Sequence, residues 1–296
     1  MISSGIIRTP VSSAYLPSAV LAALFLLAIA AGCTGVEQPD TPGDTITVAV
    51  TIPPQAEFVE RVGGDRVRVV VMVPPGASPH TYEPTPGDLT AVSRAAMYAK
   101  VGSGIEFERA WMDKITGLNP AMLVVDCSKG VDLIEADPHI WTSPRNAGIM
   151  VEEIYAGLAA VDPEHQEYYR QNADAYLQEL ESLDRDIRQA VEESGTQKIM
   201  VYHPAWTYFA EEYGLTQVPI EEEGKEPSPQ TLSRLIEEAK AEHITVIFAE
   251  PEFSTRSAEV IAAEVDGRVV LVSPLARNYT ANMQTVAEAF TATEEA

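Results

Sequence analysis

The chain has 296 residues, of which 46% are hydrophobic and 22% charged; this suits a packed globular protein of two domains or lobes and excludes a disordered or collagen-like chain. Asp and Glu number 44 against 20 Lys and Arg, and a formal charge of −24 repels phosphate backbones, so we expect no nucleic-acid partner. The chain has only two cysteines, Cys33 and Cys127, which excludes a disulfide scaffold and a zinc site made of four cysteines.

Residues 1–32 have the pattern of a secretory signal peptide. Arg8 is the only charge before an apolar run over residues 16–31, and small residues lead from the end of this run to Cys33. Small residues ending in Cys resemble the processing site of a bacterial lipoprotein, in which Cys33 carries lipid at the extracytoplasmic face of the cell membrane and residues 33–45 form a flexible tether. The alternative is an uncleaved anchor, because the run is almost long enough to span a bilayer.

Short β-branched runs alternate with amphipathic stretches over residues 46–162. Such alternation predicts an α/β lobe with a parallel sheet and helices on both faces. A further helix is expected to begin near Ser143, a capping residue followed by proline. The predicted strands are 46–52, 67–73, 97–101 and 122–126, and the predicted helices between them are 56–62, 86–94 and 108–116.

The segment 163–194 separates this lobe from the rest of the chain. Its apolar residues recur at alternating spacings of 4 and 3, and neither Gly nor Pro interrupts it after Pro163, which predicts one helix about 45 Å long. The pattern is typical of a coiled coil, but a single stretch between two α/β lobes is better interpreted as a rigid strut that limits hinge motion. The apolar positions are Tyr169, Ala173, Tyr176, Leu180, Leu183, Ile187 and Ala190.

Residues 195–296 repeat the alternation of strands and helices and predict a second α/β lobe. Ser228 and Ser254 supply capping signals at two of the helices. The predicted strands are 199–202, 216–220, 245–248 and 269–272, and the predicted helices are 205–213, 228–241, 255–265 and 279–291.

Three of the five histidines follow predicted strands, each beside a proline: His80, His139 and His203. Ligands of parallel α/β sheets bind beyond the carboxyl ends of the strands, and neutral imidazole is a common ligand of zinc and related metals. A single histidine is most often structural, and we expect this of His165 and His243. Three in equivalent places on two lobes predict a metal site.

Four segments are similar to those of the zinc/manganese group of solute-binding lipoproteins of ABC importers (ZnuA/TroA-like). The resemblance runs in order from about residue 46 to the end of the chain. It implies that His80, His139 and His203 bind the metal in the cleft between the lobes, and that a monomeric protein delivers the ion to the importer's membrane permease. The segments are GASPHTYEP (76–84), DPHIW (137–141), YHPAWTYF (202–209) and FAEPEFS (248–254).

The fourth ligand of such a site is in question here. The family usually carries Asp before Pro-Leu, whereas this chain has Ser273 before Pro274 and Leu275. Ser273 and Glu250 are candidates for the fourth position, but we favour three histidines and a water, with Glu250 orienting a ligand. A nitrogen-rich site favours zinc, with manganese as the alternative.

Two other functions compete with metal capture. Three histidines and a water on zinc also occur in hydrolases, with Glu250 as the available general base. The motifs His-Glu-x-x-His, Gly-x-Ser-x-Gly and the phosphate-binding loop do not occur, however, and we expect no enzyme activity. A surface adhesin, a role proposed for some family members, would need an exposed partner-binding patch that the sequence does not identify.

Overall fold

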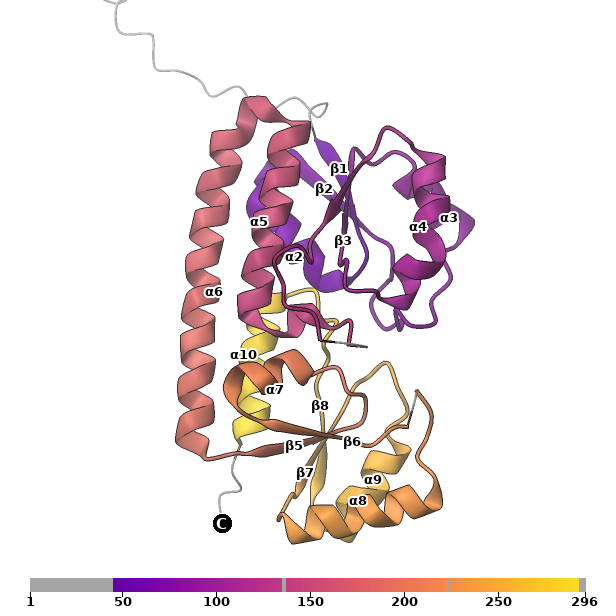
Figure 1. Ribbon diagram of the computed structural model, residues 1–296, viewed down its shortest axis with the longest axis vertical. Coiled ribbons are helices and arrows are strands. Elements are labelled where there is room, and N and C mark those ends of the chain that lie inside the picture. Colours follow the sequence, from indigo (N-terminus) through magenta and orange to yellow (C-terminus); the bar gives the residue numbers. More distant parts are fainter. Residues whose placement is uncertain (1–44, 135–136, 223, 293–296) are drawn as a thin grey trace, which may run out of the picture. The chain divides into compact units, whose positions relative to one another are not determined.

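The computed structural model describes residues 45–134, 137–222 and 224–292. The predicted signal segment and the tether with Cys33 lie outside this part of the chain. Residues Thr45–Ala296 cluster into one compact unit. Within it lie two four-stranded parallel sheets flanked by helices and one long helix, which confirms the predicted fold class (Figure 1).

The first sheet has the strand order β2-β1-β3-β4, with every neighbouring pair parallel. β1 and β3 occupy the middle, so a ligand site is expected beyond their carboxyl ends and those of their neighbours. The strands are β1 (Ile46–Val50), β2 (Val67–Val71), β3 (Met97–Lys100) and β4 (Leu123–Asp126), and the helices are α2 (Pro53–Gly63), α3 (Pro86–Val92), α4 (Glu106–Leu118) and α5 (Pro144–Val161).

The second sheet repeats this topology in the order β6-β5-β7-β8, again with every neighbouring pair parallel. The central strand β5 therefore corresponds to β1. The strands are β5 (Lys198–Val201), β6 (Thr216–Pro219), β7 (Val246–Ala249) and β8 (Arg268–Leu271), and the helices are α7 (Thr207–Tyr213), α8 (Pro229–Ala241), α9 (Arg256–Glu264) and α10 (Tyr279–Thr291).

The long helix α6 (Gln166–Ser194) follows a short 3-10 turn and runs alongside both sheets (Figure 1). It packs on α5 and α2 of the first lobe and on α10 of the second. Its buried face follows the predicted spacing up to Ile187, but the last buried residue is Val191 rather than Ala190, which is only half-buried. The correction is small: Val191 is one helical turn beyond Ile187 and carries the larger apolar side chain.

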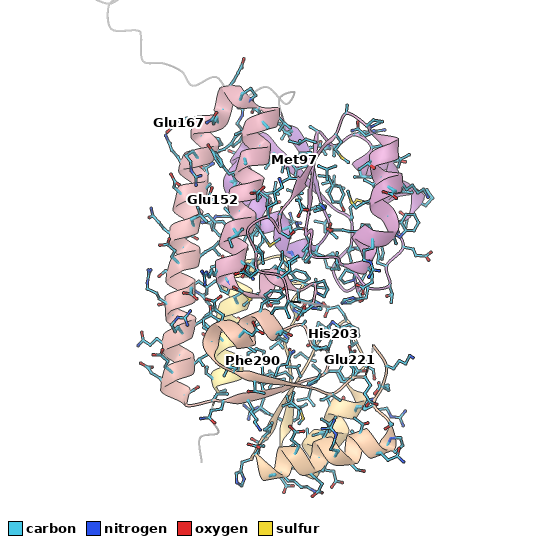
Figure 2. The ribbon with its side chains drawn as sticks, viewed as in Figure 1. Met97, Glu152, Glu167, His203, Glu221 and Phe290 are labelled. Carbon is cyan, nitrogen blue, oxygen red and sulfur yellow. The ribbon has the colours of Figure 1, made fainter. Side chains whose placement is uncertain are left out.

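A single hydrophobic cluster joins the two lobes. It includes Val48 and Val50 of the first sheet, the buried face of α6, and Trp206 and Phe290 of the second lobe. Figure 2 shows Phe290 on α10 beside the second sheet. Because α6 contributes to a core that both sheets share, it can act as the predicted strut; the division at residues 162 and 195 remains a prediction.

Most element boundaries lie within three residues of the predicted ones. α2 begins at Pro53 rather than at residue 56, because the first turn of a helix tolerates proline, whose missing N–H has no intrahelical partner there. α4 begins at Glu106, two residues before the predicted start. Across the described residues, none of the helices combines the length and the apolar character that crossing a membrane requires.

Gly157 marks a close approach between α5 and the first sheet. A Cβ at this position would lie 2.5 Å from Val125 Cγ2 and 2.8 Å from Met97 Sδ. We therefore expect Gly157→Ala to destabilise the protein by about 1–3 kcal/mol, the usual effect of overpacking. Gly148→Ala on the same helix is the control: its Cβ would meet only Leu177, at 3.5 Å, and alanine favours helix. Urea unfolding compares the two; equal stability changes would show that the approach at Gly157 is not tight.

Candidate metal site

His80 lies in the loop that follows β2, at the carboxyl edge of the first sheet. The loop is held by short backbone hydrogen bonds: Tyr82 N–H donates to Ser78 O at 3.0 Å, and Phe107 N–H donates to Pro79 O at 3.1 Å. The ring of His80 places Nδ1 2.7 Å from Glu106 Oε2 at the start of α4. This contact fixes the ring so that Nε2 faces away from α4.

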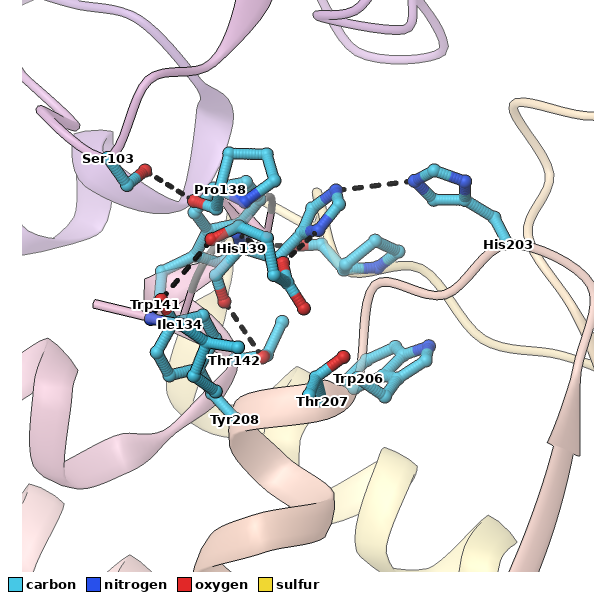
Figure 3. A network of polar contacts seen from close by, with 12 residues as sticks. Ser103, Ile134, Pro138, His139, Trp141, Thr142, His203, Trp206, Thr207 and Tyr208 are labelled. Atoms are coloured by element: carbon cyan, nitrogen blue, oxygen red, sulfur yellow. Dashed lines mark hydrogen bonds and ion pairs between the residues drawn. The ribbon is translucent and has the colours of Figure 1, made fainter. Parts of the chain in front are cut away.

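His139 lies in the loop between β4 and α5. Asp137 Oδ1 accepts hydrogen bonds from the backbone N–H of His139 at 2.9 Å and from its ring Nδ1 at 2.7 Å. Ser103, which follows β3, donates its hydroxyl to the carbonyl of Pro138 (Figure 3). The second lobe also holds this loop, because Tyr208 Oη donates to Asp137 O at 3.2 Å. His139 is thus positioned by both lobes, and its side chain is buried.

His203 lies two residues after the end of β5, one of the two inner strands of the second sheet. Its backbone N–H donates to Glu250 Oε2 at 3.1 Å, and its ring Nδ1 lies 2.8 Å from Glu221 Oε1 (Figure 2 labels His203 and Glu221 between the two sheets). The ring of Phe253 stacks on the imidazole with 4.7 Å between the ring centroids. Both Glu221 and His203 are buried, and the contacts with Glu221 and Phe253 fix the orientation of the imidazole.

The Nε2 atoms of the three histidines lie close together, within 4.8 Å of one another. His139 Nε2 lies 3.2 Å from His80 Nε2 and 3.2 Å from His203 Nε2 (Figure 3 shows the second pair). Two ligand nitrogens bound at 2.0–2.1 Å to a tetrahedral zinc ion lie about 3.3 Å apart. Among the described residues, no other group of His, Cys, Asp or Glu brings three ligand atoms within 4.8 Å of one another.

The partners of the Nδ1 atoms decide which ring nitrogens are free. Each of the three Nδ1 atoms faces a carboxylate oxygen, from Glu106, Asp137 or Glu221. An ionised carboxylate only accepts hydrogen bonds, so each Nδ1 carries the proton and each Nε2 presents a lone pair. Three lone pairs that face one another repel in the absence of a shared cation. The arrangement is therefore suited to a metal ion, with carboxylates that orient the ligating imidazoles.

Burial and charge keep His139 neutral. Burial lowers the pKa of His139, and the neighbouring His203 and His80 lower it further, against the opposite effect of Asp137. Burial alone would raise the pKa of Asp137, but hydrogen bonds and attraction from His139 hold it below its usual value. At neutral pH the pair is thus a carboxylate and a neutral imidazole, which is the protonation state that metal binding requires.

A cavity of about 900 Å³ leads to the three histidines. Both lobes line it, with Glu106 and Ile134 from the first and Glu252 and Phe253 from the second. The cavity gives an ion access to a site whose inner two histidines are buried. The predicted cleft between the lobes therefore leads to the site.

Glu250 and Ser273 form hydrogen bonds with partners other than the three Nε2 atoms. Glu250 is fully buried beneath His203: its oxygens accept from the His203 backbone and, at 3.4 Å, from Trp206 Nε1. Burial raises the pKa of Glu250 to about 8. The Ser273 hydroxyl donates to Glu252 Oε1 at 2.8 Å and accepts from Leu275 N–H at 3.1 Å. Glu250 does not belong to the group of converging ligand atoms.

Sequence reasoning missed four carboxylates around the site. Asp137 and Glu221 could have been noticed, because both follow strands at the edge where the histidines lie. Glu252 stands in the recognised segment 248–254 but was assigned no role. Glu106 has no such signal, since it begins a helix. The two remaining histidines lie elsewhere: His165 bonds Asp162 at the start of α6, and His243 is exposed before β7.

Comparison with known proteins identifies relatives of this chain. The family model for ZnuA, the periplasmic component A of a zinc-uptake complex, matches residues 48–293. The high-affinity zinc uptake system protein ZnuA of Bacillus subtilis is 31% identical over 86% of this chain and 87% of its own length. The manganese-binding lipoprotein MntA of Halalkalibacterium halodurans is 33% identical over 75% of this chain and 77% of its own.

The fold is also similar to that of a protein of known structure. A crystal structure of ZnuA superposes with a TM-score of 0.80 at 41% identity and covers 84% of this chain and 98% of its own. The region that the family model matches, residues 48–293, includes the long helix and all three histidine loops. The chain therefore belongs to the ZnuA family of periplasmic metal-uptake proteins.

Proposed function

We propose that this protein is an extracytoplasmic solute-binding protein that captures one divalent transition metal ion, with zinc preferred, and delivers it to an ABC importer. The observation that carries the proposal is the convergence of three Nε2 atoms: those of His80 and His203 each lie 3.2 Å from that of His139. Family membership supports it, because relatives named for zinc uptake and manganese binding align along most of the chain. The ligands are His80, His139 and His203, and a water completes the coordination.

The donor set favours zinc over manganese. Imidazole nitrogens suit zinc, whereas carboxylate and water oxygens suit manganese, and the Irving–Williams order places manganese lowest among the divalent first-row metals. The carboxylates of Asp137, Glu221 and Glu106 face the Nδ1 atoms instead of the free lone pairs. They therefore orient the imidazoles without supplying oxygen ligands.

We propose capture rather than hydrolysis for this site. A hydrolytic zinc site needs a general base that is ionised and faces the metal-bound water. Glu250 was the candidate base, but its pKa of about 8 keeps it largely protonated at neutral pH. Both of its oxygens are also engaged with His203 and Trp206. Glu250 instead supports the loop that carries His203.

The location completes the proposal. Cys33 carries the lipid that attaches the chain to the outer face of the cell membrane, and the permease of the importer receives the metal from a monomer. Relatives named as lipoproteins support the lipid attachment.

Metal analysis of the purified protein tests the function. We expect one zinc ion per chain and a zinc affinity at least about 100-fold above that for manganese. Competition between the two ions, followed by mass spectrometry of the intact complex and by a chromophoric chelator, measures both quantities. A chain that takes up no stoichiometric metal, or that prefers manganese, would contradict the proposal.

A further inference from the structure

Glu252 lies beside the three histidines, and the proposed function as stated gives it no role. It lines the cavity of about 900 Å³ that leads to them and also a smaller pocket between His80, His139, His203 and Pro274. It comes from the loop after β7, close to His203, and the next residue, Phe253, stacks on the His203 ring. The carboxylate is thus at the metal-facing side of the cleft.

The two oxygens of Glu252 have different surroundings. Oε1 accepts the hydroxyl hydrogen of Ser273 at 2.8 Å, and Ser273 is itself held by the Leu275 N–H at 3.1 Å. Oε2 is buried and has no hydrogen-bond partner among the residues that the structure describes. A buried carboxylate oxygen without a partner is unfavourable, which points to a ligand that the cavity admits.

The geometry excludes direct coordination in this arrangement. The ligand atoms that lie within 4.8 Å of one another are those of the three histidines, and no Glu252 oxygen belongs to this group. A direct ligand would have to lie about 3.3 Å from each nitrogen. A water molecule bound to the ion can link the two, because it can coordinate through its oxygen and donate a hydrogen bond to a carboxylate.

Asp137 also lines the cavity, and its Oδ2 is likewise buried without a hydrogen-bond partner among the described residues. It is a poorer acceptor for the water, because Asp137 already accepts two hydrogen bonds from His139. Glu252 has no such competing task, since its other oxygen only meets Ser273.

We propose that Glu252 holds the water molecule in the fourth coordination position of the bound metal, and that Ser273 positions Glu252 for this purpose. The inference rests on the proposed function, since it needs a metal on the three histidines. Ser273 stands where the resemblance implies an aspartate. In this chain the carboxylate is supplied by Glu252 from the loop after β7, and it acts on the ion through a water instead of binding it directly.

Zinc affinities of Glu252→Gln and Ser273→Ala, measured by chelator competition, test the inference. Glu252→Gln keeps the shape of the side chain and removes its charge, and we expect a loss of about 10- to 100-fold, the usual effect of removing a group that supports a metal ligand. Ser273→Ala should lose less, and the double variant should lose no more than Glu252→Gln, because Ser273 acts through Glu252. Glu83→Gln is the control: this exposed carboxylate in the His80 loop gives the same change of charge.

The outcomes separate this inference from the function itself. If Glu252→Gln binds zinc as tightly as wild type while His139→Ala does not bind it, the role of Glu252 is overturned and the proposed function stands. Normal binding by His139→Ala would overturn the proposed function itself. The absorption spectrum of the cobalt complex adds a second readout: an unchanged coordination number in Glu252→Gln supports the water, and a lost ligand shows direct coordination and overturns it. Independent, additive losses in the double variant would overturn the positioning role of Ser273. Thermal unfolding of each metal-free variant checks that it folds.

Discussion

Replacing His139 with alanine is expected to lower the zinc affinity about 100- to 1,000-fold. His139 is the central ligand, since its Nε2 lies 3.2 Å from those of both His80 and His203. Zinc bound by four ligands gains about 10–16 kcal/mol, so one ligand contributes about 2.5–4 kcal/mol, and this corresponds to the expected loss. Chelator competition at constant pH measures the change.

The matched control is His165→Ala. This histidine bonds Asp162 at the start of α6 and belongs to no group of converging ligand atoms among the described residues. We expect its zinc affinity to stay within twofold of wild type, while His203→Ala behaves like His139→Ala and guards against a folding defect at a single position. Equal affinities in all of these variants would rule out the three-histidine site.

Acidification is expected to release the metal, with a loss of affinity of about 100-fold between pH 7.5 and pH 5.5. A ligating imidazole must be neutral, so protons compete with zinc for Nε2. An ordinary imidazole has a pKa of about 6.5, and below it each ligand that takes up a proton weakens binding about tenfold per pH unit. Because its pKa is lowered, His139 takes up a proton only at a lower pH than an ordinary imidazole does.

Calorimetric zinc titrations across this pH range measure the effect, with the release of buffer protons corrected by repeating them in two buffers. A nearly constant affinity down to pH 5 would contradict imidazole ligation, because carboxylate ligands keep their charge until about pH 4. The direction follows from the sign of the competition: stronger binding at lower pH is incompatible with neutral nitrogen ligands.

The sheets and the convergence of three histidines could be predicted because local pattern and topology coincide in this chain. Each β-branched run became a parallel strand, and the rule that ligands bind beyond the carboxyl ends of such strands selected His80, His139 and His203. The structure brings their Nε2 atoms together. The long helix was visible because its apolar residues keep the spacing of one helical face over 29 residues.

What the sequence could not provide is the direction of individual side chains. Glu250 and Glu252 are two residues apart in one loop, yet Glu250 lies beneath His203 and Glu252 lines the cavity. Spacing does not distinguish them, because the loop conformation depends on Trp206 and on Ser273, which are distant in the chain. The burial of Val191 in place of the predicted Ala190 on α6 has a similar origin, since the elements that pack on the helix decide which side chain is covered.

X-ray absorption at the zinc edge of the one-to-one complex tests the central claim most directly. Imidazole rings give a characteristic outer-shell scattering, so the spectrum counts the histidines that bind the ion. The three-histidine site predicts three imidazole nitrogens and one oxygen at about 2.0–2.1 Å. A zinc ion with fewer than three imidazoles, or with a shell made mainly of carboxylate oxygens, would contradict it.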